Sequence, residues 1–324
     1  MSTRVGANPD LSPEQDWRPT ADPAALEARA RLLAQIRDFF ARRSVLEVET
    51  PLLSANTVTD PNIEPMAVDQ RWLQTSPEYA MKRLLAAGSG PIYQLCKAFR
   101  VGEAGPRHNP EFSLLEWYRP DFTLQQLMAE VADLVGSLLP RADWLSFTYR
   151  ELFRKFLDID PFTVELDALR ALSLQHIDLS FDEADRDVWL DLLLTHLIEP
   201  QLAGLGAVFV QDYPASQAAL ARLRQDGEVQ VAQRFELYID GLELANGYCE
   251  LTDADELAQR FARDNRQLQA NGSAARPVDR RLLLAMQAGL PDCSGVALGV
   301  DRLLMLQLGA TGLGEVLSFD WQRA

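Results

Sequence analysis

The stretch FRVGEAGPRHNPEFSLLEWYR, from Phe99 to Arg119, decides the fold. It follows an apolar run, Ile92 to Phe99, and its loop of glycines and prolines leads into a second strand-like segment. Alternate residues of a strand share one face. One face of this second segment therefore carries Phe112, Leu114, Glu116 and Tyr118. An aromatic ring, a carboxylate and a phenol on one wall favour a site for a purine together with an ammonium group.

The segment from Gln233 to Leu251 predicts a hairpin with one polar face. Asp240-Gly241 is typical of a two-residue turn, which pairs Tyr238 with Glu243. The register puts Phe235, Leu237, Ile239, Leu242 and Leu244 on one face, and Glu236, Tyr238 and Glu243 on the other. Glu236 and Glu243 become diagonal neighbours, with backbones on the order of 7 Å apart, so their carboxylates can share a cation. Carboxylate ligands without a Cys/His cluster favour magnesium, held jointly with substrate phosphates.

A bulge is expected further along the second strand of this hairpin. With strict alternation, Glu250 points away from Glu243. A one-residue bulge at Asn246-Gly247 would return Tyr248 and Glu250 to the polar face. We therefore predict that Glu250 faces the same site as Glu243.

The segment GVALGVDR, from Gly295 to Arg302, predicts a strand with a nearly bare face. Gly295, Ala297 and Gly299 alternate with larger residues, so that a flat ring can approach this face closely. A helix is expected to follow, with Arg302 in its first turn and leucines supplying its apolar surface.

Composition restricts the class of protein. The chain has 324 residues, a formal net charge of -16 and a pI near 4.7. This charge disfavours a broad nucleic-acid footprint, because phosphate backbones are bound by clustered Lys and Arg. The three cysteines lack CxxC spacing, so we expect reduced thiols and no zinc site. No signal peptide or membrane-spanning run is evident, and we expect a cytoplasmic enzyme with no membrane partner and no stable nucleic-acid partner.

The chain is expected to form one domain. Residues 1–21 are polar and are expected to be disordered. Asp22 caps a helix that Pro23 begins, and its predicted apolar face comprises Leu26, Ala30, Leu33, Ile36 and Phe40. Residues 22–324 then form the catalytic domain, with a helical insertion around residues 122–204 in which we find no chemistry.

These segments resemble, in order, the motifs of the class II aminoacyl-tRNA synthetases, and most closely their lysyl branch. VLEVETP at Val45 to Pro51 resembles motif 1, the Phe99 to Arg119 stretch motif 2, and GVALGVDR motif 3. SPEYAMKRLL at Ser76 to Leu85 resembles the amino-acid-binding loop and helix, and ELANGYCEL at Glu243 to Leu251 the lysine-reading strand. The resemblance implies an α/β (α+β) catalytic domain with an antiparallel sheet flanked by helices, and a homodimer formed through motif 1.

The resemblance also implies a reaction. An amino-acid carboxylate attacks the α-phosphorus of ATP to give an aminoacyl-adenylate and pyrophosphate. Two features are similar to the truncated ligases of the lysyl branch that act on elongation factor P. No anticodon-binding barrel precedes Asp22, and Ala297 stands where lysyl-type synthetases usually carry glycine. The implied substrate is (R)-beta-lysine or lysine, and the implied acceptor is the ε-amino group of a lysine on elongation factor P.

The resemblance carries over an amino-acid site residue by residue. Its implied members are Ser76, Pro77, Glu78, Glu116, Tyr118, Asn246, Glu250 and Ala297. Glu78 takes the backbone-type amine, Tyr118 with Glu250 takes the terminal ammonium, and Asn246 holds the carboxylate side. Two carboxylates that read two ammonium groups imply a diamino acid.

The resemblance also implies an ATP site, in which Arg100 and Arg302 are catalytic. Its members are Arg100, Glu103, His108, Asn109, Phe112, Glu243, Leu244, Gly299 and Arg302, with Glu236 and Glu243 on Mg²⁺. Adenine lies between Phe112 and Arg302, while His108 and Asn109 hold phosphates. The planar fork of Arg100 suits a bridge between the substrate carboxylate and the α-phosphate.

One departure from the motif 2 pattern leaves alternatives open. The family usually reads Arg-x-Glu, but Gly102 occupies that position here and the acid follows one residue later, at Glu103. The first alternative is a minimal lysyl-type synthetase that charges a tRNA. The second is a non-catalytic paralogue that binds an amino acid or nucleotide.

Overall fold

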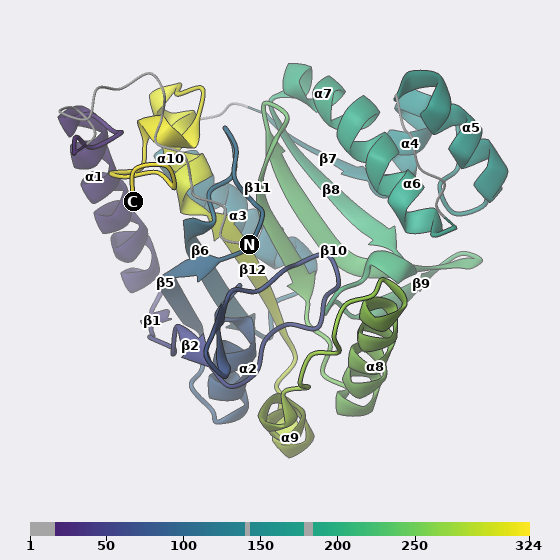
Figure 1. The fold of residues 1–324 in the computed structure, drawn as a ribbon, viewed down its shortest axis with the longest axis horizontal. Helices are drawn as coiled ribbons and strands as arrows, with labels where there is room; N and C mark the ends of the chain where they lie inside the picture. Colours follow the sequence, from purple (N-terminus) through teal and green to yellow (C-terminus); the bar gives the residue numbers. More distant parts are fainter. Residues whose placement is uncertain (1–16, 140–142, 178–183) are drawn as a thin grey trace.

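The computed structural model describes residues 17–139, 143–177 and 184–324. A nine-stranded sheet forms its centre (Figure 1). In spatial order its strands are β1 (Leu46–Glu47), β5 (Ile92–Phe99), β6 (Glu111–Pro120), β12 (Cys293–Gly299), β11 (Leu242–Cys249), β10 (Val229–Ile239), β8 (Ala207–Pro214) and β7 (Trp144–Thr148), with β9 (Leu223–Asp226) beside β10. Only the β1/β5 and β7/β8 pairs are parallel. The predicted α/β domain with an antiparallel sheet and flanking helices is confirmed.

A second, three-stranded sheet follows motif 1. It consists of β2 (Leu53–Ser54), β4 (Arg71–Leu73) and β3 (Ala67–Val68). The chain between β2 and β3 brings residues Val58 to Ile63 to the cavity described below.

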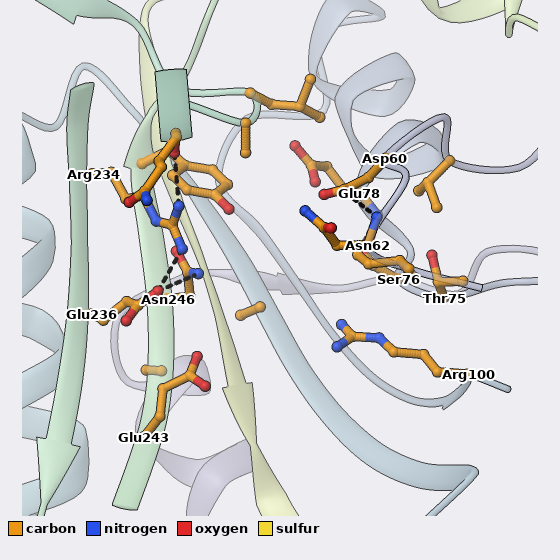
Figure 2. A pocket seen from close by; sticks show the side chains of 18 of the residues that line it. Asp60, Asn62, Thr75, Ser76, Glu78, Arg100, Arg234, Glu236, Glu243 and Asn246 are labelled. Atoms are coloured by element: carbon orange, nitrogen blue, oxygen red, sulfur yellow. Dashed lines mark hydrogen bonds and ion pairs between the residues drawn. The ribbon is translucent and has the colours of Figure 1, made fainter. Parts of the chain in front are cut away.

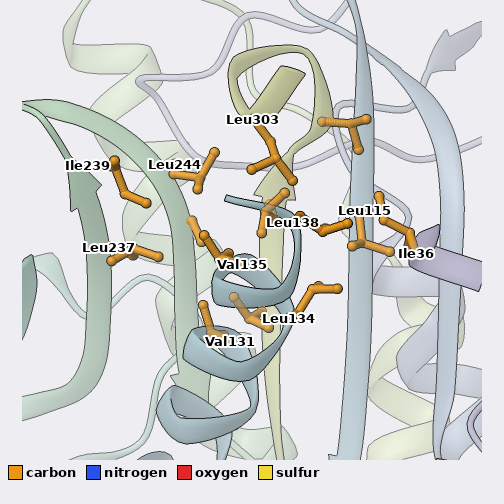
Figure 3. Close-up of a cluster of buried hydrophobic side chains, with 14 of the residues drawn as sticks. Ile36, Leu115, Val131, Leu134, Val135, Leu138, Leu237, Ile239, Leu244 and Leu303 are labelled. Carbon is orange, nitrogen blue, oxygen red and sulfur yellow. The ribbon is translucent and has the colours of Figure 1, made fainter. Parts of the chain in front are cut away.

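Three helices cover the face of the large sheet that carries the main core (Figures 1 and 3). They are α1 (Pro23–Ala41), α3 (Leu124–Leu138) and α10 (Val300–Leu308). Leu134 of α3 and Leu303 of α10 are completely buried, as is Leu237 of β10. Because alternate residues face opposite ways, the polar residues of β10 are directed to the other face.

Helix α1 begins as predicted, but the buried side differs. Asp22 Oδ1 accepts a hydrogen bond from the Ala25 amide at 2.8 Å. The buried residues are Ala25, Ala28, Leu32, Ile36, Phe39 and Phe40. Of the predicted face, Ile36 and Phe40 are buried and Leu33 packs half-buried against the core, whereas Ala30 is exposed and Leu26 is half-buried. Helix α1 instead turns its small residues Ala25 and Ala28 inward.

The remaining helices lie at two ends of the sheet. Helices α2 (Glu78–Ala86), α8 (Ala254–Ala270) and α9 (Arg280–Gly289) pack together at one end. Beyond β7 and β8 lie α4 (Tyr149–Leu157), α5 (Leu166–His176), α6 (Arg186–Leu193), the π-helix Leu194–Ile198 and α7 (Glu199–Leu202). Short 3-10 turns cover Ala203–Leu205, Ala215–Gln217 and Leu313–Glu315.

The predicted helical insertion differs from the structure in two ways. Its first helix, α3, belongs to the main core. It also contains strand β7, which pairs with β8 in parallel and extends the sheet. The strand escaped prediction because Trp144–Thr148 is short and half-buried on most of its residues, so its pattern is weak.

The N-terminal expectation lies mostly outside the described residues, which begin at residue 17. Where the structure describes this segment, it is packed. The amide of Thr20 donates to the Ser318 carbonyl at 2.9 Å, and Ala21 is 5% exposed. The expected disorder therefore does not extend to Thr20 and Ala21.

The β10–β11 hairpin confirms the predicted register and corrects the bulge. Tyr238 pairs with Glu243, as expected from the turn. The next pair is Leu237 with Ala245, so Leu244 is the extra residue, and the bulge predicted at Asn246-Gly247 is wrong. Its physical reason is that Leu244 and Ala245 are both buried in the core, which neighbours in a regular strand cannot share.

Candidate active site

The polar face of the large sheet forms the floor of one cavity of about 740 Å³. Seventeen of the eighteen predicted site residues line it, and Pro77 does not. Pro77 directly precedes α2 instead. Figure 2 shows Glu236, Glu243 and Asn246 on one side of the cavity, and Ser76, Glu78 and Arg100 on the other. Segments distant in sequence thus meet at one site.

The bulge at Leu244 directs the second half of β11 into this cavity. Asn246, Tyr248 and Glu250 all line it, as Glu243 does. The prediction that Glu250 faces the same site as Glu243 is therefore confirmed, although the bulge lies two residues earlier than expected.

One end of the cavity contains three carboxylates. Glu116 accepts hydrogen bonds from Ser76 Oγ at 2.6 Å and from the Tyr118 hydroxyl at 3.2 Å. Glu78 and Glu250 are both 2.6 Å from the ammonium of Lys82. We call these four charged residues, Glu78, Lys82, Glu116 and Glu250, the ammonium end.

Burial dominates the electrostatics of the ammonium end. It raises the pKa of Glu116 to about 8, with Glu78 adding to the shift. It also raises the pKa of Glu250 to about 7, against the attraction of Lys82. Burial lowers the pKa of Lys82, but Glu250 and Glu78 outweigh it and leave that pKa above its ordinary value. The empty site thus holds carboxylates that a cationic ligand would help to ionise.

Gly295 corrects the expected bare face of β12. A Cβ at this position would lie 2.3 Å from Cε1 of Tyr118 and 2.6 Å from Oε1 of Glu250. The face is therefore covered at Gly295 by the residues expected to take the terminal ammonium. Gly295 still lines the cavity, as do Ala297 and Gly299. Glycine is needed here because the Tyr118 ring and Glu250 approach the backbone closely.

Arg100 lies at the opposite end of the cavity. Its guanidinium is 5.1 Å from the centre of the Phe112 ring, and its Nε is buried without a hydrogen-bond partner among the described residues. Glu103 Oε1 lies 3.5 Å from Nη1 of Arg100. Gly102 has φ of +81°, a left-handed conformation that glycine adopts without strain. The motif 2 loop thus turns at Gly102 and brings Glu103 to Arg100.

Arg302 completes what we call the phosphate end, formed by Arg100, His108 and Arg302. Its Nη1 donates to the Glu243 carbonyl at 2.8 Å, and its Nη2 lies 2.8 Å from His108 Nε2. Burial and the neighbouring Arg302 lower the pKa of His108. Neighbouring Asp301 accepts from the Ser113 amide at 2.7 Å and pairs with Arg29 at 2.6 Å. These contacts fix the start of α10 against β6 and α1.

Asn109 and Leu244 contribute less than expected. The Asn109 amide donates to the Glu111 carbonyl at 2.6 Å and accepts from the Trp321 amide at 2.9 Å. Asn109 thus holds the loop to the C-terminal segment, although it also lines the cavity. The Leu244 side chain is in the core, so only its backbone can serve the cavity.

Glu236 is the most heavily hydrogen-bonded carboxylate of the cavity. It accepts from the hydroxyls of Tyr213 and Tyr238 at 2.6 Å each, from Asn246 Nδ2 at 3.2 Å, and from Arg234 at 2.5 Å. Arg234 in turn lies over the Tyr213 ring, at 4.5 Å. This network fixes the orientation of the Glu236 carboxylate.

Glu243 is the freer of the two predicted magnesium ligands. Its side chain is 40% exposed at the cavity wall, and desolvation within the cavity, with the neighbouring charge of Glu236, raises its pKa. Two adjacent carboxylates of this kind fit a divalent cation, since the cation relieves their repulsion. Among the described residues no group of three His, Cys, Asp or Glu side chains can hold a metal. The pair therefore fits Mg²⁺ only if substrate phosphates complete the coordination.

Comparison with known proteins agrees with this geometry. The model of the family described as tRNA synthetases class II (D, K and N) matches residues 15–322. The chain belongs to this class II synthetase family. The elongation factor P--(R)-beta-lysine ligase of Pasteurella multocida (strain Pm70) is 47% identical over 321 residues, covering 96% of this chain and 99% of that relative.

In this class II synthetase, sequence reasoning missed several residues that line the cavity or pair with its carboxylates. Lys82 stands four residues after Glu78, a helical spacing that could have signalled the pair. Asp60 and Asn62 reach the cavity from a loop without regular structure, which offers no such signal. Arg234 lies two residues before Glu236, on the same face of β10.

The helical segment, in which the sequence indicated no chemistry, contributes carboxylates to the cavity wall. Asp187 and Asp191 of α6 and Glu199 of α7 line the cavity. Ser216 Oγ donates to Asp187 at 2.8 Å, and Gln217 Nε2 to Asp191 at 2.8 Å. Burial raises the pKa of Asp191 and of Glu199 to about 7 each. These residues were not predicted because only the tertiary fold turns one side of α6 toward the site.

Proposed function

We propose that this class II synthetase activates (R)-beta-lysine with ATP and transfers the β-lysyl group to the ε-amino group of a lysine on elongation factor P. The observation that carries the proposal is the polarity of the cavity. Three carboxylates line one end, two of them paired with the buried Lys82, and two arginines and a histidine line the other. A substrate with two ammonium groups and one carboxylate fits this polarity, with its carboxylate directed toward ATP.

The amino acid is held by the ammonium end. Glu78 takes the amine near the carboxylate, and Glu250 with Tyr118 takes the terminal ammonium. Asn246 holds the carboxylate side: its Nδ2 donates to Glu236 at 3.2 Å, and its Oδ1 is buried without a hydrogen-bond partner in the described part of the chain. Ala297 lines the same space, and its methyl group narrows the site at the carbon chain of the substrate.

The phosphate end positions ATP. Adenine lies on the Phe112 ring and under the Arg302 guanidinium, an arrangement that stacking and cation-π attraction stabilise. Arg100, whose Nε has no hydrogen-bond partner among the described residues, would bridge the substrate carboxylate and the α-phosphate with its planar fork. Glu236 and Glu243 hold Mg²⁺, which neutralises phosphate charge when bound. Because two anions must meet, catalysis is mainly positioning and charge neutralisation.

The Glu103–Arg100 pair favours an enzyme over a binding-only paralogue. Gly102 replaces the usual acid, but its left-handed turn returns an acid to the catalytic arginine. We therefore infer that the loop around Gly102 retains its function in a different conformation. Residues 22–324 act as one catalytic domain, since the helical segment supplies Asp191 and Glu199 to the same cavity.

The acceptor is proposed from the relative. The Pasteurella multocida ligase is named for elongation factor P and (R)-beta-lysine, and its identity of 47% extends over almost the whole chain. The same reaction on a translation factor puts the enzyme in the cytoplasm. Among the described residues, no helix is long and apolar enough to cross a membrane.

A homodimer through motif 1 is part of the proposal. The side chains of Leu46, Leu52, Leu53 and Val68 are each more than a third exposed, although they are apolar. They lie along motif 1 and the adjacent small sheet, where a second copy can cover them. Sedimentation velocity of the intact chain tests this; a monomer at micromolar concentration would contradict it.

The transfer step is tested by intact-mass spectrometry of elongation factor P after incubation with the enzyme, ATP, Mg²⁺ and (R)-beta-lysine. We expect one added β-lysyl group, located by fragmentation on a lysine. Replacement of that lysine by arginine should abolish the addition. Acylation of bulk tRNA in parallel, without modification of elongation factor P, would favour the minimal synthetase instead.

A further inference from the structure

The ammonium end contains a cation of its own. Lys82 Nζ lies 2.6 Å from Glu78 Oε1 and 2.6 Å from Glu250 Oε2, and the side chains of Lys82 and Glu250 are 2% and 1% exposed. The proposed reaction gives this lysine no chemical step. A buried ion pair contributes little to stability by itself, because desolvation offsets the attraction. The position of Lys82 therefore calls for another explanation.

The number of charges at the ammonium end explains the position of Lys82. Glu78, Glu116 and Glu250 supply three potential negative charges, and Lys82 supplies one positive charge. Glu116 is contacted by the neutral donors Ser76 and Tyr118. The nearby guanidiniums are engaged elsewhere. Arg222 pairs with Asp292 at 2.7 Å, and Arg260 donates to the Ala219 and Ala221 carbonyls at 2.7 and 2.8 Å.

The fully ionised ammonium end therefore lacks two positive charges. Uncompensated buried charge is costly, so a ligand that supplies two ammonium groups is favoured over one that supplies a single ammonium. The same lysine touches both carboxylates that read the substrate. It joins α2 to the end of β11 and so fixes the distance between the two amine positions.

We infer that Lys82 is a specificity-determining residue, whose fixed ammonium neutralises one of the three buried carboxylates and sets the site for two substrate ammonium groups. This inference rests on the proposed function, because it assumes that the ammonium end binds the amino acid. It is distinct from a structural role, which would affect stability and leave the choice of amino acid unchanged.

The test changes the charge count in steps. Glu250→Gln leaves two carboxylates and Lys82, a deficit of one positive charge. The double variant Lys82→Met/Glu250→Gln removes both partners and restores a deficit of two. ATP-pyrophosphate exchange is measured with (R)-beta-lysine and with its analogue that lacks the terminal amine. The ratio of kcat/KM between these two substrates is the readout.

In the wild type we expect the diamino acid to be preferred. In Glu250→Gln we expect that preference to collapse. In the double variant we expect it to recover by at least about tenfold over Glu250→Gln, since Lys82 no longer repels the terminal ammonium. The double variant also removes a buried pair as a unit, which avoids the unpaired charge that Lys82→Met alone would leave.

Each outcome bears on the inference. A double variant that discriminates no better than Glu250→Gln, while calorimetry reports wild-type-like unfolding for both, overturns it, because Lys82 would then affect neither the choice of amino acid nor stability. A double variant that does not fold would also overturn it, because the pair would then be indispensable to the fold. A wild type without exchange on any diamino acid would instead reject the proposed function.

Discussion

The two ends of the cavity differ in both burial and charge. At the ammonium end, Glu116, Glu250 and Lys82 are almost completely buried, and carboxylates outnumber the cation. At the phosphate end, Arg100 and Arg302 are 28% and 20% exposed, and their charges face the open part of the cavity. The buried end discriminates between amino acids, because a buried carboxylate without a partner charge raises the free energy of the complex. Under the proposed function, the more exposed phosphate end would position a large, hydrated triphosphate that must enter and leave.

The largest effect is expected from Arg100, the arginine of the phosphate end that is proposed to contact both substrates. Arg100→Ala should lower pyrophosphate exchange by about a thousandfold or more, because it removes the bridge between two anions. Arg100→Lys is the matched control, since it retains the charge and loses the planar fork. It should recover only part of the rate. An alanine variant within tenfold of the wild type would remove Arg100 from the reaction centre.

The next effect concerns the buried end. Glu250→Gln should lower kcat/KM for (R)-beta-lysine by about a hundredfold, since the terminal ammonium loses its charged partner. Glu27→Gln is the control, because Glu27 forms an exposed ion pair with Arg31 on α1. It should leave exchange unchanged. Unchanged turnover in Glu250→Gln would separate Glu250 from the ammonium.

A smaller effect should distinguish the two ends directly. Gly295→Ala places a methyl group against Tyr118 and Glu250. We expect the KM for the amino acid to rise by about tenfold, while the KM for ATP changes little, because the clash lies at the ammonium end alone. Steady-state kinetics with each substrate varied in turn measures both values. An equal rise in both would indicate that the two ends are coupled.

The smallest effect is a dependence of binding on pH. Burial raises the pKa of Glu116 to about 8 and that of Glu250 to about 7, so part of the ammonium end is protonated near neutral pH. An entering ammonium lowers these pKa values and releases protons, so affinity for the diamino acid should rise between about pH 6 and about pH 8. Calorimetry in two buffers of different ionisation enthalpy measures the release. Glu116→Gln should reduce it.

The sequence predicted strand faces well and helix faces less well. The period of two in Phe112 to Tyr118 and the Asp240-Gly241 turn each specify which side chains share a wall. Helix α1 was located correctly, but its buried side was not, because alanines as well as leucines can face a core. The bulge was misplaced for a similar reason. Its position depends on the space that Leu244 and Ala245 fill together.

The sequence predicted only those residues of the candidate site that lie within a recognisable motif. Asp60, Asp187 and Asp191 come from a loop and a helix whose local sequence says nothing about the cavity. Lys82 lay inside a quoted motif but was overlooked, since a lysine four residues after a glutamate usually marks an exposed helix pair. Only the packing of α2 against the end of β11 reveals that this pair is buried and shared with Glu250.

The central claim is that the cavity activates a diamino acid with ATP. The most direct test is ATP-pyrophosphate exchange with Mg²⁺ across α-lysine, both enantiomers of beta-lysine and the analogue without a terminal amine. We predict exchange that is highest with (R)-beta-lysine, lower with α-lysine and lowest with the monoamine. Exchange highest with α-lysine would favour the minimal synthetase that charges a tRNA. No exchange with any diamino acid would contradict the central claim.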